Sequence, residues 1–437
     1  MTGKPPEPPT AFKPVTVIHS MAVVSEYIRF LKNKTEEEVV DALVAEAKRR
    51  GFRSLEEMDS LSKGDRVFFR RGNFLAVAVI GDGTEGRIVV SHVDAPRIDL
   101  KPRPFVEKDG YVYLKTHYYG GIKPYSWLNI PLEIRGKVVT ADGQEYSVSI
   151  PTVITDFAPH LDKDWKQKKV SDLFDPEKLE PVVALGTKDA VLEKIRDEFG
   201  VDEADFLSAD LKLVPKVDPE VFGANREFIM AYGHDDRSSV FASFRALLDA
   251  DYHAGISIGL FVDREETGST TEASAASSLL DYFVVQLLKR AGAGGCYSCL
   301  LDFYARSKVV SADVTAGYDP LYSELYDKEN APRLGNGVVV SRYSGVGGKA
   351  YGSEARAEYV AWIRRILEEN EVPYQPGTLG KVGKAGGGTV AMYFARRGAD
   401  VVDVGAPVLS MHSPVEVLAG ADVESAYRAY RYFYEWV

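Results

Sequence analysis

The spacing of apolar and polar residues predicts helices and strands along most of the chain. Residues 17–31 and 35–50 carry apolar side chains at helical spacing, so both segments are predicted to be helices. In the second segment, Thr35 and Glu38 form a capping box, and Gly51 ends the helix. Short β-branched and aromatic runs between Gly-rich turns predict strands at residues 66–70, 74–80 and 87–91.

The pattern changes at about residue 97. Strand-like segments joined by turn signals follow at residues 111–117, 132–135, 137–140 and 145–150. A lysine-rich run at residues 162–169 is predicted to be a surface loop, and a helix at 190–198 and a strand at 211–217 come after it. This stretch is therefore interpreted as a β-rich insertion.

From residue 230 onward, strands and helices alternate again. Helices are predicted at residues 241–248, 279–290, 354–370, 390–397 and 421–437, and strands at residues 256–262, 307–311, 338–342 and 400–404. Such alternation is typical of an α/β fold with a mainly parallel sheet and helices on both faces. We expect an α/β domain formed by residues 1–96 and 225–437, with the β-rich domain, residues 97–224, inserted between its two parts.

The length and net charge of the chain exclude some classes of protein. A chain of 437 residues is long enough for two or three domains, and its apolar content of 45% is that of a packed globular protein. The net charge of −11 argues against a nucleic-acid partner, because phosphate binding needs a basic face. The first residues lack the apolar stretch of a signal peptide, and no window approaches 18 uninterrupted apolar residues. The expected location is the cytoplasm, without a membrane span.

The two cysteines, Cys296 and Cys299, are too few for a disulfide framework. Their C-x-x-C spacing is compatible with redox chemistry or zinc binding, but a second pair that would complete a tetrahedral site is missing. We interpret them as structural residues.

Glu265 and Glu266 come directly after the apolar run 256–262. Open α/β sheets bind ligands beyond the carboxyl ends of their strands, which is where this pair is expected to lie. Two adjacent carboxylates repel each other, so a cation would stabilise them, and one of them could then act as a base. The alternative interpretation of the pair alone is a solvated acidic turn.

Further acidic and imidazole side chains follow other predicted strands. These are His92 with Asp94, the pair Asp235 and Asp236, Asp313, and His412. If they converge at one sheet edge, their mixed nitrogen and oxygen ligands suit zinc, manganese or cobalt. Asp94 is placed to hold the second ring nitrogen of His92. More carboxylates than one tetrahedral shell needs indicate two metals with one bridging carboxylate.

The same motifs, in this order, resemble the M18 family of metalloaminopeptidases. The resemblance extends over nearly the whole chain, including the insertion, and is greatest to the prokaryotic M18-family aminopeptidase 1 branch, relatives of the aspartyl aminopeptidases. It is carried by Ser91-His-Val-Asp-Ala-Pro-Arg-Ile-Asp99, Lys115-Thr-His-Tyr-Tyr-Gly-Gly121, Asp235-Asp-Arg237, Asp263-Arg-Glu-Glu-Thr-Gly268, Ser311-Ala-Asp313, Gly386-Gly-Gly-Thr389 and Met411-His-Ser413. It implies a zinc-peptidase-like fold.

The resemblance also implies roles for single residues. His92 and Asp313 would bind the first zinc ion, Glu266 and His412 the second, and Asp235 both. Asp236 departs from the Asn of many relatives, so the bridging residue could be either aspartate. Glu265 matches the general base and Asp94 belongs to the catalytic H-x-D motif. Cobalt or manganese could substitute for zinc.

The implied reaction removes the amino-terminal residue of a peptide. A metal-bridged water would lose its proton near neutral pH, and Glu265 would pass that proton to the departing amine. Gly386-Gly-Gly-Thr389 lacks the Lys-Ser/Thr ending of a phosphate loop, so it is either a tight turn or backbone that approaches the substrate. We expect substrate contacts from Gly387, Gly388, Thr389 and Lys349. For an acidic substrate side chain, Lys381 and Lys384 are further candidates.

His160 is the last candidate. From the sequence alone it is an ordinary surface residue after the strands of the insertion. In M18 relatives the inserted domain mediates dimerisation, and a His at this position reaches into the active site of the partner. The dimers assemble into a tetrahedral dodecamer. The resemblance therefore implies a composite site with a catalytic role for His160.

Two other functions compete with an aminopeptidase. The first is a related dizinc amidohydrolase or deacylase, similar to the M42 peptidases, which use the same kind of ligands. The second is a non-catalytic scaffold on a peptidase fold. A scaffold should have lost a ligand or Glu265, and neither is missing from this sequence.

Overall fold

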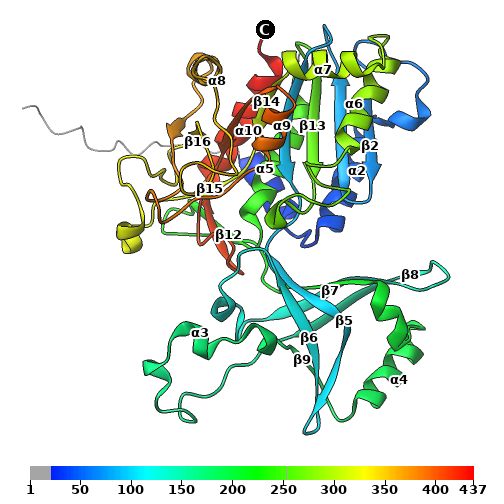
Figure 1. The fold of residues 1–437 in the computed structure, drawn as a ribbon, viewed down its shortest axis with the longest axis vertical. Coiled ribbons are helices and arrows are strands. Elements are labelled where there is room, and N and C mark those ends of the chain that lie inside the picture. The colour runs from blue at the N-terminus through cyan, green and yellow to red at the C-terminus, as the bar shows by residue number, and fades with distance from the viewer. Residues whose placement is uncertain (1–20, 252) are drawn as a thin grey trace, which may run out of the picture.

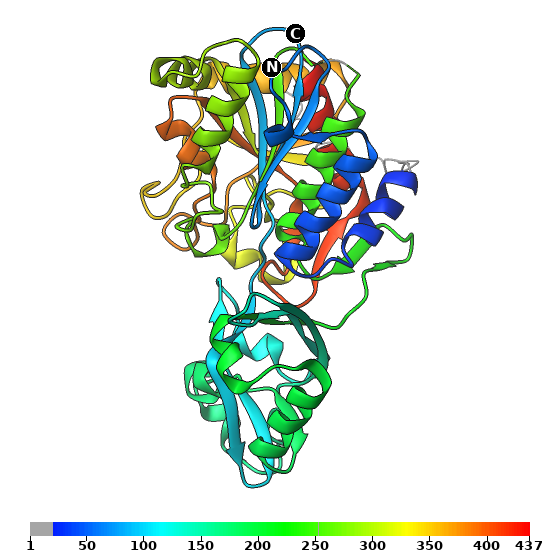
Figure 2. The ribbon, with the colours of Figure 1, turned by 90° about the vertical axis from the view of Figure 1, so that its right-hand side faces the viewer.

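The computed structural model describes residues 21–251 and 253–437, which form a sheet of nine strands, a sheet of six and a sheet of five. Figures 1 and 2 show two lobes: helices surround the nine-stranded sheet in the larger lobe, and the six-stranded sheet forms the smaller one. The expected α/β class is confirmed. Of the helix expected at residues 17–31, residues 17–20 lie outside the described part of the chain; the remainder forms α1, Met21–Phe30.

The nine-stranded sheet carries the larger lobe. Its order is β1 (Arg53–Ser54), β2 (Arg66–Arg71), β3 (Phe74–Ile80), β13 (Ile256–Val262), β4 (Gly86–His92), β14 (Lys308–Ser311), β18 (Asp400–Gly405), β16 (Val338–Ser341) and β17 (Tyr374–Pro376). The central neighbours β13, β4, β14 and β18 run parallel. Strand β3 is antiparallel to both of its neighbours, whereas β16 is antiparallel to β18 and parallel to β17. Every residue of β3, β4 and β13 is buried, as the predominance of apolar residues in these strands predicts.

Two apolar cores cover the two faces of this sheet. Because successive strand residues point to opposite faces, Leu75, Val77 and Val79 pack into one core and the residues between them into the other. The first core includes α2 (Glu36–Arg49), α5 (His234–Asp249), α8 (Ala357–Glu369) and α10 (Gly420–Glu435). The second includes α6 (Leu279–Arg290), α7 (Tyr297–Arg306) and α9 (Ala391–Arg396). The helices therefore flank both faces of the sheet.

The helix ends follow the local chemistry of the sequence. Thr35 accepts the amide of Glu38 and the Glu38 side chain accepts the amide of Thr35, which is the expected capping box of α2. Helix α6 has the predicted bounds. Short 3-10 helices occupy several connections: Leu55–Glu57, Pro124–Trp127, Trp165–Gln167, Pro176–Lys178, Glu203–Ser208, Glu265–Thr267 and Pro320–Leu325.

A five-stranded sheet lies beside the nine-stranded one. Its order is β11 (Glu220–Phe222), β12 (Phe228–Ala231), β20 (Glu416–Ala419), β19 (Pro407–Leu409) and β15 (Thr315–Ala316). Because β20 pairs with both β12 and β19, the segments that follow β12 and β19 meet in space although they are far apart in sequence.

The six-stranded sheet contains the β-rich stretch expected after residue 97. All its neighbours are antiparallel, in the order β8 (Glu145–Thr152), β7 (Leu132–Val139), β10 (Ala209–Pro215), β5 (Arg97–Lys108), β6 (Tyr111–Tyr119) and β9 (Val182–Leu185). One apolar core and the helix α4 (Lys188–Phe199) pack on it, and α3 (Val170–Leu173) lies in the connection before β9. Strands β5 and β6 lead to the junction of the two lobes (Figure 1).

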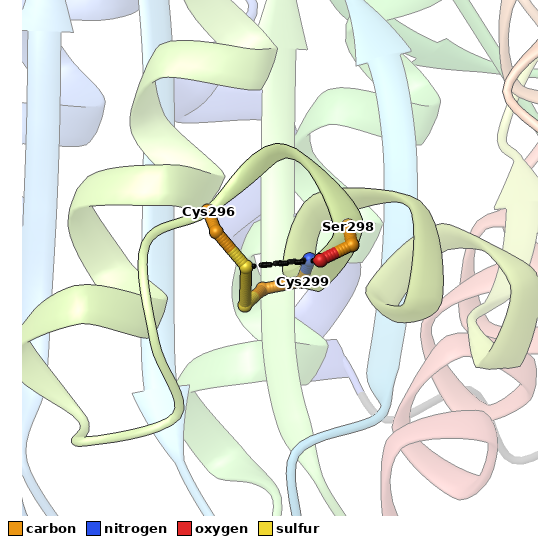
Figure 3. Close-up of a disulfide and its surroundings, with 3 residues drawn as sticks. All are labelled: Cys296, Ser298 and Cys299. Carbon is orange, nitrogen blue, oxygen red and sulfur yellow. Dashed lines mark hydrogen bonds between the residues drawn. A yellow bond between two sulfur atoms is a disulfide. The ribbon is translucent and has the colours of Figure 1, made fainter.

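The cysteines form a disulfide across three sequence positions at the start of α7 (Figure 3). Cys296 is the N-cap residue, and its sulfur accepts the amide of Cys299 at 3.3 Å. The bond links neighbours within one turn and ties no distant segments together. Among residues 21–251 and 253–437 no helix combines the length and apolar character needed to cross a bilayer.

Candidate functional site

The parallel strands bring three candidate segments to one sheet edge. His92 is the last residue of β4, Glu265 and Glu266 open the 3-10 helix after β13, and Asp313 follows β14. Strand β4 pairs in parallel with both β13 and β14, so these carboxyl ends lie side by side.

The five-stranded sheet positions the other two candidate ligands, Asp235 and His412. Asp235 lies in the first turn of α5, directly after β12, and His412 lies between β19 and β20. Since β20 joins β12 and β19, Asp235 and His412 approach each other and the sheet edge described above.

Two His–carboxylate groups result, and they share Asp235. Its Oδ1 lies 3.1 Å from Nε2 of His92, and an oxygen of Asp313 lies 3.9 Å from the same nitrogen. Its Oδ2 lies 3.3 Å from Nε2 of His412, which is also 3.3 Å from Oε1 of Glu266. One carboxylate thus faces both imidazoles.

These residues fit a pair of divalent cations. Ligand atoms of Asp235, Glu266 and His412 lie within 4.8 Å of one another, as do those of His92, Asp236 and Asp313. Oε1 of Glu266 and Oδ1 of Asp236 are buried without a hydrogen-bond partner among the described residues. A buried polar atom without a partner is costly, and a cation in each of the two groups would satisfy the oxygen of that group. The donor set, imidazole nitrogen with carboxylate oxygen, suits zinc.

The pKa shifts of the carboxyl groups at the site also indicate that it binds cations. Burial, together with the charge of Asp235, raises the pKa of Glu266 well above its usual value, and burial with Asp236 does so for Asp313. Burial also raises the pKa of Glu265 to about 7, with Asp94 and Asp235 adding to the shift and His92 opposing it. Without cations these carboxyl groups tend to remain protonated, so metal binding would release their protons.

Asp94 organises the turn after β13. It is fully buried, and its carboxylate accepts the amides of Glu265 at 3.1 Å and Glu266 at 3.2 Å. The nearest acceptor for Nδ1 of His92 is the backbone oxygen of Asp94 at 3.0 Å, whereas the carboxylate oxygen lies 3.4 Å away. Asp94 therefore contacts the His92 ring, with its main chain closer than its side chain.

Glu416 has a role that the sequence analysis missed. Its buried carboxylate accepts the amide of His412 at 2.7 Å and that of Asp235 at 3.0 Å. Burial and the charge of Asp235 raise its pKa to about 8. His412 adopts a φ of 66°, which is uncommon outside glycine, and the bond to its amide stabilises this backbone. The only sequence signal was a Glu four residues after a candidate His.

The candidate substrate residues line one cleft of about 730 Å³ together with the metal candidates. Gly387, Gly388, Thr389 and Lys349 all face it. The amide of Gly345 donates to the carbonyl of Gly387 at 2.6 Å, and the Thr389 hydroxyl donates to the buried Asp403 at 2.8 Å. These bonds hold the glycine loop as a wall of the cleft, with the hydroxyl of Thr389 already engaged.

The candidate lysines differ in their surroundings. Nζ of Lys349 lies 3.2 Å from the Glu354 carboxylate and 3.9 Å from the ring centre of Tyr343, so its charge is partly compensated. Lys381 also lines the cleft, whereas Lys384 lies outside the described residues that line it.

His160 lies on the other lobe, away from this cleft. It is exposed in the connection after β8, on the six-stranded lobe, and lies outside the set of described residues that line the cleft. Within a single chain it therefore stays a surface residue.

The chain is similar in sequence and in fold to known aminopeptidases. The model of the family described as "Aminopeptidase I zinc metalloprotease (M18)" matches residues 30–434. A probable M18 family aminopeptidase 1 from Borreliella afzelii is 38% identical over 434 residues, 94% of each chain. The crystal structure of an M18 aminopeptidase from Thermotoga maritima superposes with a TM-score of 0.92 at 37% identity, covering 95% of this chain and 96% of that one. The mApe1 dodecamer of S. cerevisiae shares the fold, with a TM-score of 0.75 at 22% identity over 95% of this chain and 96% of that one.

Proposed function

We propose a two-metal mechanism from the premise that this chain belongs to the M18 family of zinc aminopeptidases. It is a metalloaminopeptidase, a hydrolase that removes amino-terminal residues from peptides. We further propose that it uses two zinc ions, and we assign the residues that would hold them and the general base.

In this proposal His92 and Asp313 would hold the first zinc ion, Glu266 and His412 the second, and Asp235 would contribute to both. The observation that carries the assignment is the Asp235 carboxylate, whose two oxygens face two different imidazoles at 3.1 and 3.3 Å.

Asp236 is the alternative bridging residue, because it also lies with His92 and Asp313. One of its oxygens accepts the amide of His92 at 3.2 Å, which ties that oxygen to the backbone. We therefore favour Asp235 as the bridge.

Glu265 is assigned as the general base. When bound, a zinc pair supplies Lewis acidity that lowers the pKa of water and polarises the scissile carbonyl. Glu265 lines the cleft beside the candidate ligands. Its carboxylate also lies within 4.8 Å of ligand atoms of His92 and Glu266, but each of the two groups assigned above has an imidazole and carboxylates without it. Its pKa of about 7 allows its carboxylate to accept a proton at neutral pH and give it to the departing amine.

The cleft walls would position the peptide. We infer that the backbone of Gly387 and Gly388 approaches the substrate chain, since both line the cleft and neither has a side chain that fills it. Lys349 and Lys381 are the cationic groups placed to meet an acidic side chain, and Lys349 would first have to leave Glu354.

A panel of substrates tests the proposed function. We expect the purified protein to bind two zinc ions per chain and to cleave aminoacyl anilides of Asp, Glu, Lys, Leu or Gly, with the acylated amino acids left intact. Cleavage of the acylated compounds alone would favour the deacylase alternative. Two bound metals without either activity would favour the scaffold.

We also propose that residues 97–224 mediate dimerisation. Tyr111 and Leu185 are exposed beside each other on neighbouring strands of this lobe, where they would give a partner an apolar contact. Phe157, Leu161 and Leu207 are further exposed apolar residues of the lobe. The S. cerevisiae relative of the same fold is a dodecamer, and a tetrahedral dodecamer of this chain is the corresponding proposal. In such a dimer His160 would enter the cleft of the neighbouring subunit.

Mixed dimers test the shared site. We expect His160→Ala and Glu265→Gln, each inactive alone, to regain activity when co-assembled, because one site of a mixed dimer would have His160 from one chain and Glu265 from the other. As an oxyanion donor His160 would contribute a few kcal/mol, about 10²–10³-fold in kcat. A mixture as inactive as either parent, despite verified subunit exchange, would rule out the shared site.

A further inference from the structure

The end of strand β6 reaches the metal centre from the other lobe. Strand β6 belongs to the six-stranded sheet and leads to the junction of the lobes (Figure 1). It ends at Tyr119, and Gly120 and Gly121 follow it in the sequence. The metal candidates themselves come from the strands of the larger lobe. This short segment is therefore a contact of the inserted lobe with the site.

Tyr119 contacts the centre through Asp94. Its hydroxyl donates to Oδ2 of Asp94 at 2.6 Å, and the contact is buried. The same carboxylate accepts the amides of Glu265 and Glu266. A hydroxyl that fixes this carboxylate thus also fixes the turn that carries both glutamates.

Gly121 contacts the centre through His412. Its carbonyl lies 3.1 Å from Nδ1 of His412, and a carbonyl can only accept, so Nδ1 carries the proton. The other nitrogen, Nε2, faces Asp235 and Glu266 and is the one that a metal ion would bind. Metal-binding imidazoles use such a bond to set the ring orientation and the tautomer.

The two glycines allow this close approach. A Cβ on Gly121 would lie 3.3 Å from Nδ1 of His412, and one on Gly120 would lie 3.4 Å from Cβ of Glu266. Gly120 also has a φ of 72°, a backbone conformation that glycine adopts readily. The segment therefore packs directly against both residues of the second His–carboxylate group.

Buried charges hold Tyr119 in place. The guanidinium of Arg97 lies 3.9 Å from the centre of its ring, and Arg97 pairs with Glu36 at 3.1 Å. Lys212, from β10 of the six-stranded sheet, pairs with the same Glu36 carboxylate at 3.1 Å. All three charged groups are buried, and Glu36 belongs to α2 of the larger lobe, so the pairs join the two lobes behind the tyrosine.

We propose that residues 119–121 form a positioning clamp through which the inserted lobe sets the geometry of the metal centre. Tyr119 orients Asp94 and the turn of Glu265 and Glu266, and the Gly121 carbonyl orients His412. Both act through other residues and neither is a metal ligand. This inference rests on the proposed two-zinc site.

Tyr119→Phe removes the hydroxyl and retains the ring between its neighbours. We expect the full-length variant to fold like the wild type but to bind zinc roughly 10–100-fold more weakly, as the loss of an outer hydrogen-bond partner does. With zinc in excess, kcat should fall while KM stays within about twofold, because Tyr119 lies outside the residues that line the cleft. Zinc affinity is measured by competition with a chelator, and folding by thermal unfolding of the zinc-free proteins.

Gly121→Ala tests the other arm of the clamp. Its added methyl group would push His412 away, so we expect one zinc ion per chain to be weakened more than the other. Tyr118→Phe is the matched control: Tyr118 precedes Tyr119, is 44% exposed, and should keep the wild-type zinc affinity.

The possible results distinguish a failure of the clamp proposal from a failure of the proposed function. A wild-type protein without zinc or peptidase activity would overturn the proposed function itself. If the wild type binds two zinc ions and both Tyr119→Phe and Gly121→Ala match it in zinc affinity and kcat, the clamp does not exist. Equal losses of zinc affinity in Tyr118→Phe and Tyr119→Phe would also contradict the clamp, because both substitutions would then act through a general disturbance of β6.

Discussion

Replacing Glu265 by glutamine is expected to leave two metals bound while kcat falls by roughly 10²–10⁴-fold, the usual contribution of a general base. The substitution keeps the size of the side chain and its backbone bond to Asp94, and removes only its capacity to take a proton. Elemental analysis of the purified variant and steady-state kinetics with an aminoacyl anilide measure the two quantities separately.

Glu272→Gln is the matched control, because Glu272 is exposed in the same loop after β13 and should keep full activity. The contradicting outcome for Glu265→Gln is loss of metal together with activity. Glu265 would then be a ligand, and Glu266 the candidate for the base.

Replacing Asp235 by asparagine is the second large effect that we expect. Because its two oxygens face both imidazoles, Asp235→Asn should weaken both metal sites, whereas His412→Ala should weaken mainly one. The loss of affinity should exceed the roughly 10–100-fold that removal of an outer hydrogen-bond partner costs. Zinc titration with a chromophoric chelator resolves the two sites.

Asp236→Asn distinguishes the two adjacent aspartates, since it changes the neighbouring side chain in the same way. We expect it to retain zinc at the site of Glu266 and His412, from whose group of ligand atoms Asp236 is absent. If Asp236→Asn empties both sites and Asp235→Asn does not, the bridge is Asp236.

Local signals predicted much of the fold. The capping box at Thr35 and the bounds of α6 depend on residues within a few positions of one another, so the sequence contains all the information they need. The buried strands β3, β4 and β13 were likewise predicted from local runs rich in apolar residues. The helix α7 was not predicted, and its short amphipathic stretch begins at the disulfide that closes its first turn.

Much of the candidate site could also be predicted. His92, Glu265, Glu266 and Asp313 each follow a strand, and parallel strands bring such residues to one edge. The choice between Asp235 and Asp236 could not be made in this way. Adjacent residues share every local signal, and only the folded backbone turns one carboxylate toward both imidazoles and the other toward the amide of His92.

The sequence by itself determined the kinds of candidate ligand and their places near the ends of strands, because apolar periodicity and residue chemistry are local properties. Only the tertiary structure decided which atoms support them. Glu416 joins the backbone amides of Asp235 and His412, and Tyr119 reaches Asp94 from another sheet. These bonds are made between segments brought together by sheet pairing and by packing of the two lobes, and no short-range pattern in the chain encodes that proximity.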